Sequence, residues 1–418
     1  MTQEQTVAVA APAARAAEAV VQRPHLVWVV PADLTLMLSA ATYLDTTRYL
    51  RTLGWRVTLV SMGPAERRQI RGIEVLCIPA QERYFVGKHA WHVAVRRFLR
   101  QHRDDVDVVL FLEESVPWLL PLRWRRALSG ATRPLLVMDT RSVHMPPPQR
   151  QRLRIRLRGA YTAVMTWLGN HAADGRTVIT PRMATAVRVP PRRVWGIWPS
   201  GVDPAPFAAA AARRRWPGPD EPIRLIYLGS LEFERNLLAV CQAVRQANAE
   251  GLRFELVLIG AGPQKEALEA LAAAPGSGVR VLPPVPHPEV PGALAQVHMG
   301  VLPFPDEEKF LVSSFVKLFE YMASGLVVLA TRIGCHTDVV GDGRYAIWAE
   351  GSRAEDLLAA LRQAWQERHT LAARGAEGMA ASGDWTWEAT ARKLSQALQT
   401  GLRRAGGGAG LPPPAGAA

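Results

Sequence analysis

Short runs of branched and aromatic apolar residues alternate with longer helix-like segments along most of the chain, and the alternation forms two blocks. Strands separated by helical segments are typical of a parallel sheet with crossover helices. The first block predicts strands at 25–30, 56–60, 106–112 and 134–138. The second predicts strands at 224–228, 254–259, 279–282, 300–303, 326–330 and 345–348, with helices at 238–250, 263–274 and 354–366. We therefore expect an α/β fold with two doubly wound, Rossmann-like domains that face a cleft.

Proline- and alanine-rich sequence near residue 200 separates the two blocks. Pro190, Pro191 and Pro199 precede an Ala/Arg/Pro-rich segment at 208–222. The chain has 418 residues, 48% of them hydrophobic, which is enough for two cores. We expect disordered tails at 1–23 and 403–418, an N-terminal domain at 24–198, a C-terminal domain at 199–385, and a helix at 386–402 that crosses back to the N-terminal domain.

Composition limits the compartment in which the chain works. Its three cysteines are too few and too far apart for a disulfide framework or a zinc site, which favours a reducing compartment. The first 21 residues lack the basic start of a secretory signal. The longest uncharged run tested as a membrane span, 159–173, is shorter than the ~20 residues that a spanning helix needs. We expect a cytoplasmic protein.

Positive charge is concentrated in the first half of the chain. Residues 1–200 hold 29 Lys and Arg against 14 Asp and Glu, whereas residues 201–418 hold 21 against 23. No nucleic-acid recognition motif accompanies this charge, so we expect no nucleic-acid partner. A helix expected at 149–171 would carry five of the basic residues: Arg150, Arg152, Arg154, Arg156 and Arg158. Six further arginines would add to its basic face: Arg96, Arg97, Arg100, Arg123, Arg125 and Arg126. This basic face would either contact the inner face of the cell membrane peripherally or simply be solvated.

The segment 313–330 carries the strongest chemical signal. It predicts a polar loop, a short helix with Lys317 and Glu320, a glycine stop at Gly325 and a buried strand. Lys317 and Glu320 are three positions apart, so both would project from one helix face toward a ligand at the helix N-terminus. Free N–H groups, the helix dipole and the ammonium group suit a phosphate, and the carboxylate suits sugar hydroxyls. This pattern indicates a nucleotide-sugar site.

Two glycine-containing turns lie at the expected carboxyl ends of strands. The first holds Gly229 and Ser230, with Arg235 six residues beyond the glycine, and the second holds Gly260 and Gly262. Glycine allows a ligand to approach the backbone closely. Ordinary strand-to-helix punctuation explains either turn equally well when it is considered alone.

As an ordered set, these segments resemble bacterial group-1, family-4 glycosyltransferases of the GT-B type, which have two Rossmann-like domains. The set comprises Y-L-G-S-L and R-N-L within 227–237, V-L-I-G-A-G-P at 257–263, V-P-H-P-E-V at 285–290, K-L-F-E-Y-M-A-S-G at 317–325, T-R-I-G at 331–334 and D-W-T-W-E at 384–388. The resemblance covers roughly residues 195–395. Upstream it thins to Gly201-Val-Asp203 and to the segment 136–141.

The resemblance implies a retaining transfer of a sugar from a nucleotide-diphosphate donor, held by the C-terminal domain, to a saccharide or lipid-linked acceptor, in polysaccharide or glycolipid biosynthesis. It implies neither a metal ion nor a further cofactor. Glu320 would hold the ribose, and the backbone of Ser314, Phe315 and Val316 would cradle the diphosphate. Lys317 and Arg235 would neutralise the departing nucleotide, where charge accumulates as the bond breaks.

The chain departs from the pattern of this family at several positions. Val312 stands where relatives carry the first Glu of a Glu-x7-Glu pair, and Asp306, Glu307 and Glu308 are the candidate substitutes. Ser230 and Asn236 replace an Arg and a Lys. The glycine-rich loop expected after the first strand is also missing. A nucleotide-sugar epimerase on the same fold and a non-catalytic binding protein therefore stay open.

Polar residues after the fourth expected strand are candidates for the acceptor side. Asp139 would orient an acceptor or the donor sugar, with loop capping as an equal alternative. His144 follows closely, although a lone histidine is more often inert. Asp105 and Asp107 imitate a metal-binding Asp-x-Asp, but they precede a strand, so we expect solvated charges there.

Overall fold

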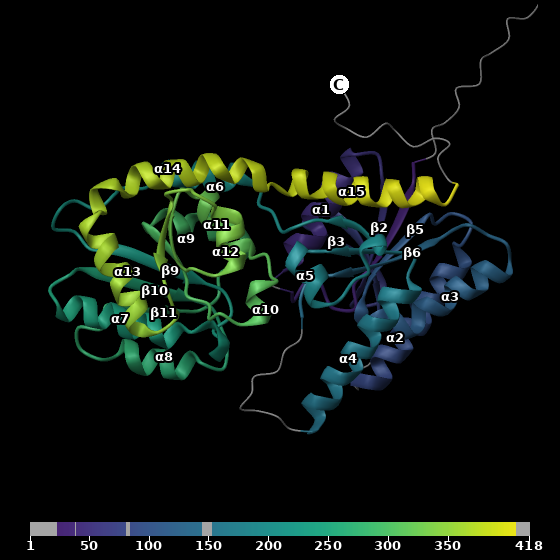
Figure 1. The fold of residues 1–418 in the computed structure, drawn as a ribbon, viewed down its shortest axis with the longest axis horizontal. Helices are drawn as coiled ribbons and strands as arrows, with labels where there is room; N and C mark the ends of the chain where they lie inside the picture. Colours follow the sequence, from purple (N-terminus) through teal and green to yellow (C-terminus); the bar gives the residue numbers. More distant parts are fainter. Residues whose placement is uncertain (1–22, 38, 81–83, 144–152, 407–418) are drawn as a thin grey trace, which may run out of the picture.

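The computed structural model describes residues 23–37, 39–80, 84–143 and 153–406 and shows two α/β domains side by side, joined along one edge by a long C-terminal helix (Figure 1). The N-terminal sheet has the strand order β3-β4-β2-β1-β5-β6-β7-β8, and every pairing except β3 with β4 is parallel. The C-terminal sheet has the order β11-β10-β9-β12-β13-β14 and is wholly parallel. This architecture confirms the predicted fold class.

The N-terminal strands are β1 (His25–Val29), β2 (Arg56–Met62), β3 (Glu66–Ile70), β4 (Ile73–Ile78), β5 (Val108–Leu112), β6 (Leu135–Thr140), β7 (Gly175–Val178) and β8 (Val194–Ile197). The helices of this domain are α1 (Ala40–Thr52), α2 (Tyr84–Gln101), α3 (Val116–Leu128), α4 (Leu153–Ala172) and α5 (Pro181–Ala186). Parallel strands buried on both faces account for the continuous apolar sequence of β1 and β5.

The C-terminal strands are β9 (Ile223–Leu228), β10 (Phe254–Ile259), β11 (Val279–Leu282), β12 (Met299–Leu302), β13 (Val327–Thr331) and β14 (Ala346–Ala349). The remaining helices are α6 (Pro204–Ala211), α7 (Leu237–Ala249), α8 (Lys265–Ala272), α9 (Val290–Ala295), α10 (Glu308–Leu311), α11 (Val316–Ala323), α12 (Gly334–Val340), α13 (Ala354–Gln366), α14 (Leu371–Ala381) and α15 (Trp387–Arg404). All ten predicted strands form, with ends within two residues of those expected.

Four strands of the N-terminal sheet were not predicted, namely β3, β4, β7 and β8. The polar sequence of β3 resembles a loop, and its antiparallel pairing with β4 places it at the sheet edge. In β7, a glycine and the fully buried Arg176 hide the strand pattern. The guanidinium group of Arg176 donates through Nε to Met138 O and through Nη2 to Thr140 Oγ1, whereas its Nη1 is buried without an acceptor among the described residues.

Helix α15 crosses from the C-terminal domain and completes the core of the first one. Leu394, Leu398 and Leu402 pack in the same buried cluster as residues of β1 and β2. The Nε1 atom of Trp55 donates to Ser395 Oγ at 2.8 Å. The helix continues to Arg404, two residues beyond the predicted end. None of the helices in the described ranges is both long and apolar enough to cross a membrane.

The two domains also meet beside the central cleft, through α5 on one side and the segment around α10 to α12 on the other. Arg182 forms a bidentate ion pair with Asp338 at 2.7 and 2.9 Å. Thr180 Oγ1 donates to Val312 O at 2.7 Å. These contacts hold the carboxyl end of the second sheet against the N-terminal domain.

Candidate functional site

The central strands of the C-terminal sheet define where a ligand can bind. The chain leaves β9 toward β10 and β11 on one side, whereas β12 leads to β13 and β14 on the other. Open α/β sheets bind ligands at the carboxyl ends of the strands that flank such a switch point. The loop after β9 contains Gly229, Ser230 and Arg235, and the segment after β12 leads into α11. The topology thus brings the predicted donor residues to the same edge of the sheet.

Lys317 lies against the Gly229 turn. Its Nζ is 5.5 Å from the centre of the Tyr227 ring, and the Tyr227 hydroxyl donates to Ser230 O. A Cβ atom on Gly229 would lie 2.5 Å from Lys317 Cε, so a side chain at this position would push the end of the lysine aside. Burial and the nearby Arg235 lower the pKa of Lys317 to about 8, and Glu320 opposes this shift. At pH 7 the ammonium group is still charged.

Arg235 supplies a second cation beside Lys317. Its guanidinium carbon lies 5.2 and 5.5 Å from the ring centres of Phe304 and Phe310, and its buried Nε–H has no acceptor. Within the described ranges, neither Arg235 nor Lys317 forms an ion pair with a carboxylate. Two neighbouring cations without an acidic partner raise each other's free energy, and a bound anion would relieve this repulsion.

The N-terminus of α11 adds backbone donors. The first amide that donates into the helix is that of Leu318, to Phe315 O at 3.1 Å. The N–H groups of Ser314, Phe315, Val316 and Lys317 have no acceptor in the part of the chain that the structure describes. The side chain of Ser314 accepts a hydrogen bond from the amide of Ser200, which fixes this loop against the interdomain segment. Free amides and the helix dipole favour an anion at this position.

Glu320 lies in different surroundings from Lys317. The two were predicted to hold different parts of one ligand, the ribose and the phosphate, and that assignment stays a prediction. Glu320 is 7% exposed and lines an interdomain pocket of about 290 Å³, whose opposite wall includes Asp45, Arg48 and Arg71. The Nε2 atom of His287 lies 3.5 Å from Glu320 Oε1. Lys317 does not line this pocket. One turn of α11 therefore separates a cationic site from a carboxylate that faces the gap between the domains.

The second glycine turn, at Gly260 and Gly262, packs directly against the first. A Cβ on Gly260 would lie 1.8 Å from Gly229 O, and one on Gly262 would lie 2.5 Å from Leu231 O. Gly229 N donates to Ile259 O, and Leu231 N donates to Ala261 O, both at 2.9 Å. These glycines are thus required by the crossing of two backbone segments. Of the two interpretations that the sequence left open for this turn, the structural one accounts for both glycines, and their contact with a donor stays a prediction.

Val312 has become part of the domain interface. It packs in a buried cluster with residues from the N-terminal domain: Val178, Ile179, Met183 and Val189. Of the proposed substitute carboxylates, Glu307 pairs with Lys309 at 3.0 Å, and Asp306 and Glu308 are exposed. The position where the family resemblance led us to expect a carboxylate is used here for apolar contact between the domains.

Asp139 has no exposed surface, so the predicted contact with a sugar is not available in this conformation. Its Oδ1 accepts hydrogen bonds from Thr177 Oγ1 at 2.6 Å and Trp198 Nε1 at 3.0 Å, while its Oδ2 is buried without a donor. Burial raises the pKa of Asp139. Arg141 lies 3.8 Å from the carboxylate and stacks on Trp198 at 3.6 Å. Asp139 therefore positions Arg141 and Trp198. His144 lies outside the described residues.

Glu113 is the acidic residue that the sequence interpretation missed. It follows β5 directly, and β5 lies beside β1 at the switch point of the N-terminal sheet. Burial, with a contribution from the neighbouring Glu114, raises the pKa of Glu113 to about 7. An acidic pair at the end of an apolar strand was the available signal. By contrast, Asp105 and Asp107 pair with Arg56 and Arg133 at the opposite edge. Asp105 is partly exposed, as expected of a solvated charge, whereas the side chain of Asp107 is largely buried and accepts a hydrogen bond from the amide of His25.

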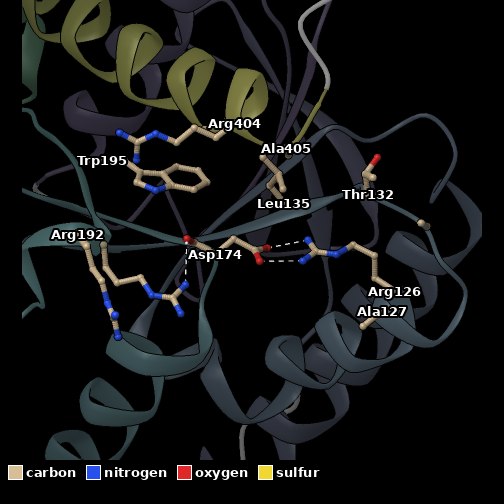
Figure 2. Close-up of a pocket in the computed structure, with 12 residues that line it drawn as sticks. Arg126, Ala127, Thr132, Leu135, Asp174, Arg192, Trp195, Arg404 and Ala405 are labelled. Carbon is tan, nitrogen blue, oxygen red and sulfur yellow. Dashed lines mark hydrogen bonds and ion pairs between the residues drawn. The ribbon is translucent and has the colours of Figure 1, made fainter.

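A second pocket, of about 680 Å³, lies at the amino ends of β6, β7 and β8, away from the cleft (Figure 2). Arg126 and Asp174 form a bidentate ion pair across its floor, and Trp195 and Arg404 stand opposite them. The Arg126 and Arg123 partners hold the pKa of Asp174 below its usual value although burial opposes them. This pocket contains no predicted site residue.

Comparison with known protein families matches residues 222–367 to the model "Glycosyl transferases group 1". This segment contains the glycine turns, Arg235, Lys317 and Glu320. The C-terminal domain belongs to the group-1 glycosyl transferases. As in the prediction, the resemblance is concentrated in the second half of the chain.

Curated relatives extend this result. The 2-deoxystreptamine glucosyltransferase of Streptomyces kanamyceticus is 28% identical over 48% of this chain and 54% of its own length. The D-inositol 3-phosphate glycosyltransferase of Geodermatophilus obscurus is 28% identical over 82% of this chain and 74% of its own. The chain thus spans only about half the length of the first of these relatives.

Similarity to solved structures confirms the GT-B fold over both domains of the chain. Sucrose-phosphate synthase from Thermosynechococcus elongatus superposes with a TM-score of 0.70 at 17% identity, covering 91% of this chain and 100% of the other. The Anabaena protein HepE in complex with UDP-glucose gives 0.66 at 12% identity, with 90% and 99% coverage. Both domains are therefore arranged as in these structures.

Proposed function

We propose that the chain transfers a sugar from a nucleotide-diphosphate sugar to an acceptor held by the N-terminal domain, with retention of anomeric configuration. The observation that carries this proposal is the pair of cations, Lys317 and Arg235, which lie beside the free amides of α11 and form no ion pair with a carboxylate of the described residues. A diphosphate supplies the missing negative charge. The membership of the C-terminal domain in the group-1 family supports the same assignment.

The same cations assist the reaction as well as binding. When the bond between sugar and diphosphate breaks, negative charge grows on the leaving phosphate and positive charge grows on the sugar ring. Lys317 and Arg235 are fixed by aromatic rings before the ligand arrives, so little reorganisation is needed. Glu320, which lines the interdomain pocket, accepts hydrogen bonds from the ribose hydroxyls. No nucleophilic side chain and no metal ion are required by this scheme.

The acceptor lies at the carboxyl edge of the N-terminal sheet. Glu113 accepts a hydrogen bond from the attacking hydroxyl, because a carboxylate with a pKa near 7 can take up a proton at neutral pH. Arg141, held by Asp139 and Trp198, orients the acceptor by hydrogen bonding. The absence of glycine after β1 leaves this edge without the phosphate-binding loop of typical dinucleotide sites.

Two acceptor classes are compatible with this arrangement. The names of the relatives, 2-deoxystreptamine glucosyltransferase and D-inositol 3-phosphate glycosyltransferase, favour a small polyhydroxylated ring. The basic N-terminal half favours a lipid-linked acceptor or a saccharide in polysaccharide or glycolipid biosynthesis, with the protein on the inner face of the membrane. We adopt the lipid-linked or saccharide acceptor.

Thermal shift with nucleotides tests the donor site. UDP, GDP and ADP and their glucose derivatives are added to the full chain, beginning with UDP because the Anabaena neighbour was solved with UDP-glucose. A bound nucleotide raises the melting temperature. If no nucleotide raises it, the proposal fails and a non-catalytic binding protein is favoured. Interconversion of the donor sugar without any acceptor would instead establish the epimerase.

A further inference from the structure

One face of α4 is exposed and apolar along most of its length. The side chains on this face are 45–61% exposed: Leu157, Tyr161, Val164 and Trp167. Their spacing of four, three and three residues places them on one side of a helix. Residues on the other side, such as Met165 and Leu168, pack against the N-terminal core instead. The four exposed side chains therefore lie outside the buried N-terminal core.

Basic residues surround this apolar face. Arg156 and Arg158 are exposed on α4 itself, and Arg125 is exposed on α3, which packs against α4. Helix α3 also exposes Trp124 and Leu128, at 66% and 88%. Helix α4 projects from the N-terminal domain, with one end extending below the body of the molecule (Figure 1). A large exposed apolar patch on a protein surface marks a site that contacts another protein or a membrane.

We infer that the apolar face of α4 inserts into the surface of an anionic lipid bilayer, with Arg156 and Arg158 on the lipid headgroups. Large aliphatic and indole side chains partition into the headgroup and acyl boundary, and arginines are attracted to negative lipids at about 1 kcal/mol each. Charge complementarity selects this occupant over a second copy of the chain, because two copies would bring like-charged arginines together. The inference deepens the proposed function, because a membrane-bound enzyme fits a lipid-linked acceptor.

This assignment also revises the sequence interpretation of the basic helix. Arginines alone suggested the membrane, and Arg123 and Arg126 were counted among them. The structure pairs both with Asp174, so they are occupied elsewhere. The side chains of Arg150, Arg152 and Arg154 lie outside those that the structure describes. The apolar side chains of α4, which the arginine pattern did not reveal, supply the main driving force.

Vesicle co-sedimentation of the full chain tests the inference. Vesicles of phosphatidylcholine are compared with vesicles that also contain phosphatidylglycerol, and binding to the anionic vesicles is expected. The double variant Leu157→Ser/Trp167→Ser should partition at least about tenfold more weakly, because two large side chains lose their burial in lipid. Arg156→Gln/Arg158→Gln should weaken binding only at low salt. Leu282→Ser, which changes an exposed leucine of the other domain, should bind as the parent does.

Nucleotide-induced thermal shift, measured on the same variants, separates this inference from the proposed function. All of them should retain the parent's response to UDP, which also shows that they are folded. If the double serine variant pellets like the parent, the inference is wrong. If the parent does not pellet and sedimentation velocity shows a dimer that the serine variant dissociates, a second copy covers the face instead. Pelleting without a response to UDP, GDP or ADP would sustain the membrane surface and refute the donor site.

Discussion

Replacement of Lys317 by methionine should make the unliganded protein more stable while removing nucleotide binding. The folded protein lowers the pKa of this lysine from 10.5 to about 8. Each pKa unit corresponds to ~1.4 kcal/mol, so the charged ammonium costs up to about 3 kcal/mol at pH 7. Lys317→Met keeps a similar length and removes the charge. Because ~1 kcal/mol shifts the melting temperature of a domain of this size by about 2–4 °C, a rise of several degrees is expected.

The pH dependence has a definite sign. Because the unfolded chain binds this proton more tightly than the folded one, the stability of the parent protein increases as the pH rises from about 8 toward 10.5. The advantage of Lys317→Met should therefore be largest at and below pH 7 and should shrink above pH 8. Differential scanning fluorimetry across this pH range, with and without UDP, measures both effects.

A neighbouring lysine provides the matched control. Lys309 pairs with Glu234 at 2.9 Å and Glu307 at 3.0 Å, so its charge is compensated. Lys309→Met should leave the melting temperature unchanged or lower it, and it should keep the UDP response. A Lys317→Met protein that melts at or below the parent temperature at every pH, and still responds to UDP, would refute the electrostatic reasoning.

Three further predictions address the remaining residues. Glu320→Ala should weaken UDP binding by roughly 10- to 100-fold, as expected for lost charge-assisted hydrogen bonds, but leave pyrophosphate binding unchanged. Calorimetry with both ligands measures this difference, and equal losses of affinity would place the carboxylate at the phosphates. Gly229→Ala should lower the free energy of unfolding by about 1–3 kcal/mol and abolish the UDP response, because φ is 143° and the new Cβ would lie 2.5 Å from Lys317 Cε. Chemical denaturation measures the stability, and unaltered UDP binding would exclude Gly229 from the site. Transferase activity should rise as the pH passes through about 7, where Glu113 loses its proton. Glu113→Gln should abolish this rise in the pH–rate profile while UDP still raises the melting temperature. An unchanged pH–rate profile would exclude Glu113 as the proton acceptor.

Much of the C-terminal domain could be predicted because its signals are local. The strand of β13 is a continuous apolar run, α11 is bounded by a polar loop and by Gly325, and Gly325 has the positive φ of 63° that a helix stop often adopts. Such features depend on residues close together in sequence. The N-terminal sheet was less predictable, because the polar strand β3 depends on pairing with β4 and a buried arginine interrupts the pattern of β7.

The sequence also contained the main donor residues, but their partners could not be deduced from it. Lys317 and Arg235 were predicted as phosphate-binding cations, and this role stays a prediction. Only the folded chain shows that neither forms an ion pair within the described ranges. The need for Gly260 beside the Gly229 turn likewise follows only from the crossing of two loops. Asp139 shows the opposite case, because its position after a strand was clear while its complete burial was not.

The sequence by itself determined the alternation of strands and helices, and hence two doubly wound sheets, because hydrophobic periodicity and helix-stop signals act over a few residues. It also determined the chemical types available at the carboxyl ends of the strands. The tertiary structure alone decided which of these groups meet, since segments distant in the chain contribute to each contact. Val312 fills the domain interface, Glu113 is partly buried at the carboxyl end of β5, and α4 keeps an exposed apolar face. Burial and pairing of charged groups are properties of that packing, and they set the pKa values on which the proposed chemistry depends.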